Sequence, residues 1–373
     1  MPKSTKYFAL IALSLLAYLG THAAPIISVP HYAKNFEIAQ FPTHRIATIR
    51  NLQRGSTATH QYALVPKGEP LPELPAGMIV IRTPVARVVV METVYIGYLD
   101  ALNQLDTIIA AATPDYVSNT TIRTRIEEGT IQKVQSGAAI NIERMLLLQP
   151  DLILSSVTGD PAFDIPLKLG RSGLPVVLTA GYMEQHPLAR AEWIKFIAAF
   201  FDAGDLAEQT FDGVAIRYEA LCKKVSTIDQ RPTVFCGAPY SGAWHMAGGA
   251  SYTAQTIRDA GGDYIWADVP GSGAIPLDTE RVFLKAAHAD IWINPSFYRS
   301  LNQLYGADQR FQKFHAGQTG QVFNNTKQGT ASGGNSIWER GIVHPDDVLA
   351  DLIKVFHPDL MPDWEFIYYE QLK

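Results

Sequence analysis

From about residue 85 to the end of the chain, short continuous apolar runs alternate with segments in which apolar residues recur at helical spacing. Val88 to Val90 is a continuous apolar run of the kind that is buried in a parallel sheet. Apolar residues then recur at helical spacing from Tyr95 to Leu105. This pattern is typical of an α/β domain with a parallel sheet. Further strands are predicted at residues 106–109, 131–134, 152–155 and 174–178.

A long helical region separates two such series. Residues 185–228 predict a linking helix with Trp193 and Phe200 on its apolar face, and residues 202–205 are a candidate for a kink. The strand and helix pattern starts again at Thr233. We therefore expect an α/β fold with two similar, Rossmann-like lobes joined by one long rigid helix. The predicted boundaries are an N-terminal lobe at 85–184, the linking helix at 185–228 and a C-terminal lobe at 229–373.

The segment before the first lobe has a different pattern. Residues 44–51 and 61–65 read as short strands around a turn-rich stretch at 54–56. Prolines then follow at close intervals up to Pro84, which favours an extended linker. Residues 24–84 are thus predicted to be an N-terminal extension with short strands.

The first 23 residues have the features of a secretory signal peptide. Lys3 and Lys6 precede an apolar run from Phe8 to Leu19, and the small residues Thr21 and Ala23 stand at the −3 and −1 positions of a cleavage site after Ala23. The run is short for a membrane span, although an uncleaved anchor is the alternative. No Cys follows the run to carry a lipid. We expect a soluble, monomeric protein in the periplasm of a Gram-negative cell.

Charge and cysteine content bear on the binding partners of the protein and on its disulfide bonding. Loss of Lys3 and Lys6 takes the formal net charge from −5 to −7, and a mildly acidic chain is not typical of a nucleic-acid or membrane-surface partner. Cys222 and Cys236 are the two cysteines. In an oxidising compartment they either form a disulfide or remain buried thiols, and the sequence leaves both possibilities open.

Common catalytic signatures are missing from the sequence. It contains no Gly-x-Ser-x-Gly elbow, no His-Glu-x-x-His, no Cys-x-x-Cys and no phosphate-binding loop. The glycine-rich stretches at 248–250 and 271–273 lack fingerprint spacing and read as turns. The histidines are scattered and give no metal-ligand pattern. We therefore predict no catalytic residue, no metal site and no cofactor of the protein's own.

Aromatic and polar residues gather where predicted strands end. The carboxyl ends of parallel strands are where open α/β sheets bind ligands, and aromatic rings with a few polar groups suit a large, partly apolar molecule. Ordinary packing of loop aromatics is the alternative for each. The predicted cleft residues are Tyr95, Tyr240, Trp244, His245, Trp338 and Arg340.

Two predicted helices begin in the same way, one in each lobe. Asn141 and Asp278 are N-cap residues, and Glu143 and Glu280 follow in the first turn. A carboxylate there offsets the helix dipole by about 0.3–1 kcal/mol, which would by itself explain either glutamate. Their matched occurrence suggests a pair of acidic contact points for a two-fold symmetric partner.

Several short stretches follow one another in a specific order from about residue 85 to residue 373. They are Arg87–Val90, Asn141–Arg144, Gln149–Leu154, Gly173–Val177, Pro187–Phe196, Asp259–Tyr264 and His357–Leu360. Their order resembles the periplasmic binding proteins for ferric siderophores, haem and cobalamin. The resemblance implies a class III binding protein of an ABC importer with its ligand between the lobes. It also implies that Glu143 and Glu280 dock onto arginines of a permease dimer.

The function we predict is capture of a metal chelate and its delivery to a permease, without catalysis. A ferric siderophore is preferred over cobalamin or haem, although no single residue decides among them. The alternatives are a metal-binding enzyme or metal chaperone on the same scaffold, with His245 or His344 as a ligand, and a sensory protein without an importer.

Overall fold

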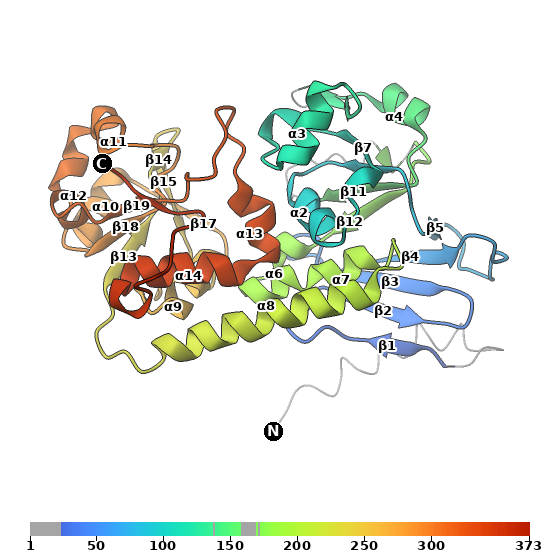
Figure 1. Ribbon diagram of the computed structural model, residues 1–373, viewed down its shortest axis with the longest axis horizontal. Helices are drawn as coiled ribbons and strands as arrows, with labels where there is room; N and C mark the ends of the chain where they lie inside the picture. Colours follow the sequence, from blue (N-terminus) through green and yellow to red (C-terminus); the bar gives the residue numbers. More distant parts are fainter. Residues whose placement is uncertain (1–23, 137–138, 158–168, 171) are drawn as a thin grey trace.

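Two α/β lobes lie side by side along helix α8 in the computed structural model, which describes residues 24–136, 139–157, 169, 170 and 172–373 (Figure 1). The first lobe has a five-stranded parallel sheet in the order β12-β11-β6-β7-β8. Its strands are β6 (Val88–Val90), β7 (Ile108–Ala111), β8 (Gln132–Lys133), β11 (Leu152–Ser156) and β12 (Val176–Thr179). Its helices include α2 (Val94–Ala101), α3 (Thr120–Glu127) and α4 (Ile142–Leu148), and β9 (Gln135–Ser136) pairs with β10 (Ala139–Ile140) in a separate antiparallel sheet.

The second lobe has a similar sheet in the order β16-β13-β18-β19-β20, in which β20 is antiparallel to the other four strands. These strands are β13 (Thr233–Cys236), β16 (Asp263–Tyr264), β18 (Ile291–Ile293), β19 (Val322–Asn324) and β20 (Glu370–Gln371). A separate antiparallel sheet contains β14 (Pro239–Tyr240), β15 (Ala243–Ala247) and β17 (Ala274–Leu277). The helices are α9 (Tyr252–Asp259), α10 (Thr279–Ala286), α11 (Leu301–Ala307), α12 (His315–Gln318), α13 (Arg340–Val343) and α14 (Pro345–Phe356).

The linking segment is three helices rather than the one long helix that we predicted. They are α6 (Pro187–Ala191), α7 (Trp193–Ala198) and α8 (Gly204–Val225). The chain breaks before α8 because Asp202 adopts a left-handed backbone conformation, with φ of 54°, which a helix does not accommodate. Helix α8 then extends for 22 residues and buries one face that includes Phe211, Val214 and Tyr218. The predicted kink is thus a full break.

Residues 24–84 form a five-stranded sheet. The strands predicted at 44–51 and 61–65 are present, whereas the prediction of a linker up to Pro84 is wrong, because residues 79–83 form a further strand. The five strands pair in chain order, all antiparallel except the last two. The sequence pattern missed three strands because one face of this sheet is covered by protein and the other is only partly so, which blurs the alternation. The strands are β1 (Ile26–Ser28), β2 (Phe36–Gln40), β3 (Arg45–Arg50), β4 (Thr59–Pro66) and β5 (Ile79–Thr83).

Buried carboxylates fasten this N-terminal sheet to the linking helices. The carboxylate of Glu192 is fully buried and accepts hydrogen bonds from the backbone N–H groups of residues 31, 32 and 33 at 2.7–2.9 Å. Glu184 accepts two more from residues 34 and 35. Phe36 then packs edge-on against the ring of Trp193, with centroids 4.9 Å apart. The extension therefore belongs to the same folded body as the linking helices.

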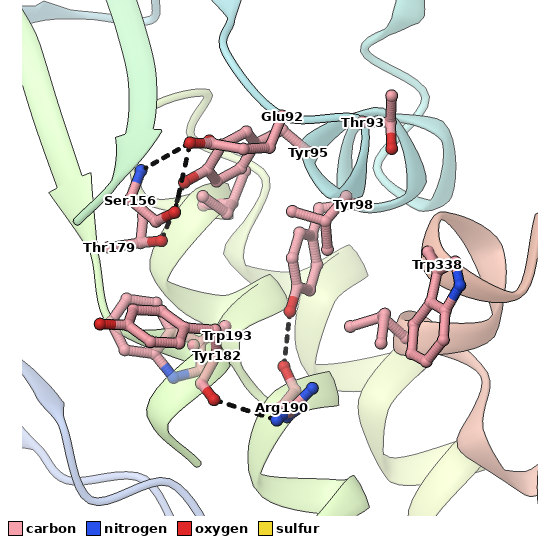
Figure 2. A pocket seen from close by; sticks show the side chains of 14 residues that line it. Glu92, Thr93, Tyr95, Tyr98, Ser156, Thr179, Tyr182, Arg190, Trp193 and Trp338 are labelled. Atoms are coloured by element: carbon pink, nitrogen blue, oxygen red, sulfur yellow. Dashed lines mark hydrogen bonds between the residues drawn. The ribbon is translucent and has the colours of Figure 1, made fainter. Parts of the chain in front are cut away.

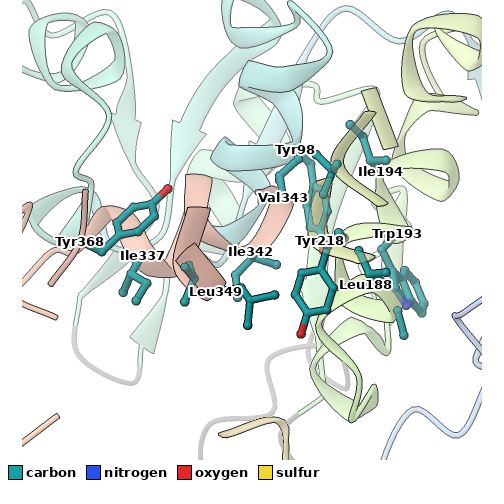
Figure 3. Close-up of a cluster of buried hydrophobic side chains, with 14 of the residues drawn as sticks. Tyr98, Leu188, Trp193, Ile194, Tyr218, Ile337, Ile342, Val343, Leu349 and Tyr368 are labelled. Carbon is teal, nitrogen blue, oxygen red and sulfur yellow. The ribbon is translucent and has the colours of Figure 1, made fainter. Parts of the chain in front are cut away.

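One continuous hydrophobic core runs through both lobes and the linking helices. Figure 3 shows Tyr98 from α2, Trp193 from α7, Tyr218 from α8 and Leu349 from α14 within the same cluster. Such a core holds the lobes in one arrangement, because well-packed interiors resist sliding. The expectation of an α/β fold with two Rossmann-like lobes is confirmed. Cys222 and Cys236 are both free thiols in the structure, so the disulfide alternative is not realised.

Candidate ligand-binding cavity between the lobes

A cavity of about 230 Å³ lies where the first lobe meets the linking helices and α13. Residues that follow β6, β11 and β12 line it on one side, and the 3-10 helix η5 (Ser336–Trp338) and α13 of the second lobe complete it on the other. Because β6, β11 and β12 are parallel, their carboxyl ends meet at one edge of the sheet. This is the position where α/β sheets bind ligands.

The carboxyl group of Glu92 forms one end of this cavity. Glu92 lies two residues after the end of β6, and its Oε1 accepts hydrogen bonds from the backbone N–H and the hydroxyl of Ser156, each at 3.2 Å (Figure 2). The hydroxyl of Ser155 approaches the same atom at 3.5 Å. Desolvation raises the pKa of Glu92 to about 7, although these hydrogen bonds favour the ionised form.

Two tyrosines of α2 form the adjoining wall. Tyr95 is 1% exposed, and its hydroxyl shares a hydrogen bond of 3.0 Å with that of Thr179 at the end of β12. Tyr98 lies one turn later and donates to the backbone oxygen of Arg190 at 2.6 Å. Burial raises the pKa of both phenols, so they stay neutral.

Aromatic rings and one guanidinium form the remaining walls (Figure 2). Trp193 is buried, Tyr182 is partly exposed, and Trp338 comes from the second lobe with 49% of its side chain exposed. Arg190 donates to the backbone oxygens of Tyr182 and Glu184, both at 3.0 Å, and lies over the ring of Tyr252. The cavity thus has apolar walls and few polar groups, as small-molecule sites usually do.

The two lobes are in direct contact next to the cavity. Glu339, between η5 and α13, accepts hydrogen bonds from the backbone N–H groups of Ser118 at 2.7 Å and Asn119 at 2.9 Å. Gly97 allows α2 to approach, because a Cβ atom at this position would lie 2.3 Å from the backbone oxygen of Glu339. Glu339 thereby joins the second lobe to the N-terminus of α3 in the first.

The structure brings together two of the six predicted cleft residues. Tyr95 and Trp338 line the same cavity, and their contact with a ligand stays a prediction. Tyr240 is 64% exposed on β14 and His245 is exposed on β15, and neither lines this cavity. Phe297, which the sequence reasoning did not consider, is also strongly exposed and follows β18. Tyr240 and Phe297 thus lie just beyond the ends of neighbouring parallel strands of the second lobe.

The prediction that Trp244 faces the cleft is wrong, and Arg340 does not line this cavity. The indole of Trp244 is fully buried among the rings of Phe235 and Trp292, and its Nε1 donates to the backbone oxygen of Cys236 at 2.9 Å. Alternation along β15 turns Trp244 inward and His245 outward. Arg340 bonds to Asp347 and to the hydroxyl of Tyr368 within its own lobe.

Sequence reasoning missed Glu92, Tyr98 and Arg190. Glu92 had a usable signal, because an acidic residue just after a buried parallel strand stands at the ligand-binding edge of a sheet. Tyr98 and Arg190 had none, since each lies within a mostly buried helix and reaches the cavity only through tertiary packing.

Glu143 and Glu280 are exposed on α4 and α10, one in each lobe. The predicted N-caps are present, since Asn141 and Asp278 accept hydrogen bonds from the backbone N–H groups three residues later at 2.9 and 2.7 Å. Glu280 also pairs with Arg310 at 2.9 Å and remains 71% exposed. The hydrogen bond from its own backbone N–H and the pairing with Arg310 hold the pKa of Glu280 below its usual range.

Residues 24–136, 139–157, 169–170 and 172–373 contain no group of three His, Cys, Asp or Glu side chains that come together as a metal site. None of the helices in them combines the length and apolarity of a bilayer span. The predicted signal peptide, residues 1–23, lies outside the described residues.

Residues 88–328 match a protein-family model described as periplasmic binding protein. Two proteins of Methanocaldococcus jannaschii, both named as uncharacterized lipoproteins, are similar over 361 residues. One is 27% identical and covers 90% of this chain and 83% of its own length; the other is 26% identical and covers 93% and 88%. In this chain the first Cys after the apolar run Phe8–Leu19 is Cys222.

Solved structures share the fold at low sequence identity. A periplasmic solute-binding protein from Veillonella parvula has a TM-score of 0.55 at 16% identity over 76% of this chain and 84% of its own. A periplasmic haem-binding protein from Pseudomonas aeruginosa has a TM-score of 0.57 at 15% identity over 74% and 93%. An Fe3+-hydroxamate transport protein from Saccharomonospora viridis has a TM-score of 0.53 at 17% identity over 73% and 93%.

Proposed function

The chain belongs to the periplasmic binding protein family, and from that premise we propose that it is the substrate-binding protein of an ABC importer. Its cargo is a metal chelate, with a ferric siderophore as the first candidate ahead of haem or a corrinoid. The protein works as a monomer in the periplasm, without catalysis, and passes its cargo to a permease dimer.

The observation that carries this proposal is the arrangement of aromatic side chains around the cavity between the lobes. Tyr95 and Tyr98 belong to the first lobe, whereas Trp338 belongs to the second. Large aromatic rings that remain exposed on a folded protein often mark binding sites, because burying them in a complex is favourable. Trp338, at 49% exposed, and Phe297, at 76%, are such rings.

The size of the cavity limits how much of a chelate it encloses. Ligand pockets commonly measure about 300–1,000 Å³, and this one holds about 230 Å³. We infer that one arm of the ligand enters the cavity while the bulk of the chelate lies outside it, toward Tyr240 and Phe297. The names of the haem-binding and hydroxamate-transport neighbours support this class of cargo.

Trp338→Ala is expected to weaken chelate binding on the order of 30-fold, since loss of an aromatic hot spot costs about 2 kcal/mol. Quenching of tryptophan fluorescence would be titrated with ferric hydroxamate, ferric catecholate, haem and cobalamin. The matched control is Ile216→Ala, an exposed residue of α8 that does not line the cavity. Equal affinities for Trp338→Ala and the unaltered protein would remove Trp338 from the site.

A further inference from the structure

The carboxyl group of Glu92 lacks a counter-charge in the cavity. Its Oε1 is engaged by the two serines of β11, but Oε2 is buried and has no hydrogen-bond partner among the described residues. A buried carboxylate without a partner is unfavourable, and native structures usually pair it. An unpaired oxygen on a residue that lines a ligand cavity therefore points to a partner that arrives with the ligand.

No positively charged side chain that lines the cavity pairs with this carboxyl group; the group beside it is the neutral hydroxyl of Tyr95, which also shares a hydrogen bond with Thr179. Arg190 is engaged by two backbone oxygens and lies 4.2 Å from the centroid of the Tyr252 ring. Tyr95 and Tyr98 on α2 face the cavity as neutral phenols, and Tyr182 donates its hydroxyl to the backbone oxygen of Leu52. Glu339 precedes α13, which packs against α2, and its carboxylate accepts hydrogen bonds from the backbone N–H groups of Ser118 and Asn119 at the N-terminus of α3.

The remaining walls suit a cation as well. Five aromatic side chains line the cavity, and the faces of aromatic rings attract organic cations, most strongly where water is excluded. A carboxylate at one end of an aromatic enclosure is the arrangement that recognises alkylammonium groups. The terminal carboxyl torsion of glutamate is broad, so a small rotation presents Oε2 to the cavity. The aromatic residues are Tyr95, Tyr98, Tyr182, Trp193 and Trp338.

We propose that this cavity binds an organic ammonium group carried by the ligand, held by the carboxylate of Glu92 and enclosed by the aromatic walls. The inference rests on the proposed function in one respect, namely that the ammonium group is an arm of the transported chelate. It specifies the chemistry of that arm, which the fold does not.

The proposal has a defined dependence on pH. A cation binds the ionised carboxylate, and the fraction of ionised Glu92 rises with pH around its pKa of about 7. The amine of the probe stays protonated over this range. Affinity for an ammonium group should therefore increase on the order of 30-fold between pH 5.5 and pH 8, while affinity for an uncharged analogue of the same size should not change.

The experiment uses two small probes that fit the cavity, para-fluorobenzylammonium and para-fluorobenzyl alcohol, followed by fluorine NMR with the full-length protein. We expect the ammonium to bind at least tenfold more tightly than the alcohol at pH 8 and to lose most of this advantage at pH 5.5. Glu92→Gln should abolish the advantage at both pH values. Glu127→Gln, an exposed residue of α3, is the matched control and should leave both affinities unchanged.

Equal binding of the two probes, absence of binding by either, or an unchanged preference in Glu92→Gln would each overturn the proposal. If Glu92→Gln fails to fold, the pH titration of the unaltered protein decides by itself. Failure of the proposed function looks different, because the ammonium probe would then bind while none of the four metal chelates does.

Discussion

Gly97→Ala is expected to lower the free energy of unfolding by about 2 kcal/mol and to loosen the contact between the lobes. The added Cβ would lie 2.3 Å from the backbone oxygen of Glu339 and 2.5 Å from its carbonyl carbon, and a backbone segment cannot yield as a flexible side chain does. Alanine favours a helix over glycine by about 1 kcal/mol, which offsets only part of this overpacking. Urea unfolding measures the loss.

Gly306→Ala is the matched control for this substitution. Gly306 also lies within a helix, α11, but no atom comes within 4 Å of a Cβ placed there. Its replacement should leave stability unchanged or raise it by up to about 1 kcal/mol. If Gly97→Ala proved as stable as the unaltered protein, the close packing of α2 against the Glu339 segment would not describe the molecule in solution.

Replacing both Glu143 and Glu280 by alanine is expected to reduce uptake of the chelate to background while ligand affinity and folding stay nearly unchanged. Both carboxylates are exposed in the first turn of capped helices, one in each lobe. Exposed leucines, Leu147 and Leu284, follow each glutamate by one helical turn, with 84% and 86% of their side chains accessible. Each lobe therefore offers an acidic group beside an apolar one, which suits a two-fold symmetric partner.

Uptake of radioactive iron chelate into proteoliposomes containing the cognate permease and ATPase would measure this effect. The surface pair of Glu280 with Arg310 is no obstacle, because exposed ion pairs exchange readily with better partners. The double variant Glu127→Ala, Glu128→Ala removes two exposed carboxylates from α3 and should transport normally. Normal transport by the Glu143, Glu280 variant would refute docking through these residues.

The sequence predicted the two lobes well because buried parallel strands appear as continuous apolar runs in the sequence. Runs such as Val88–Val90 must be apolar on both faces, and the N-caps Asn141 and Asp278 mark where helices start. Two strands of the N-terminal sheet were predicted, but its attachment to the linking helices was not, because the attachment depends on Glu192, whose three hydrogen bonds to residues 31–33 span about 160 positions of the chain.

The candidate site was only partly predictable for a related reason. The position of a residue after a strand places Tyr95 near the cavity, but whether a ring points inward or into its own lobe is decided by tertiary packing. Trp244 shows the limit: it lies eight residues after Cys236 and yet fills the core of the second lobe. Glu92 was missed for the opposite reason: an acidic residue is ordinarily expected to face water, whereas this one is mostly enclosed in the cavity wall.

Native mass spectrometry of the protein purified from its own cells tests the central claim most directly, because a transported chelate should travel with its binding protein. The account predicts an adduct of several hundred daltons that carries the isotope pattern of a metal and the absorbance of its chelate, and that is lost on mild unfolding. It also predicts a weaker adduct in Trp338→Ala. A protein that carries no adduct, and that gains none from ferric siderophores, haem or cobalamin, would contradict the assignment.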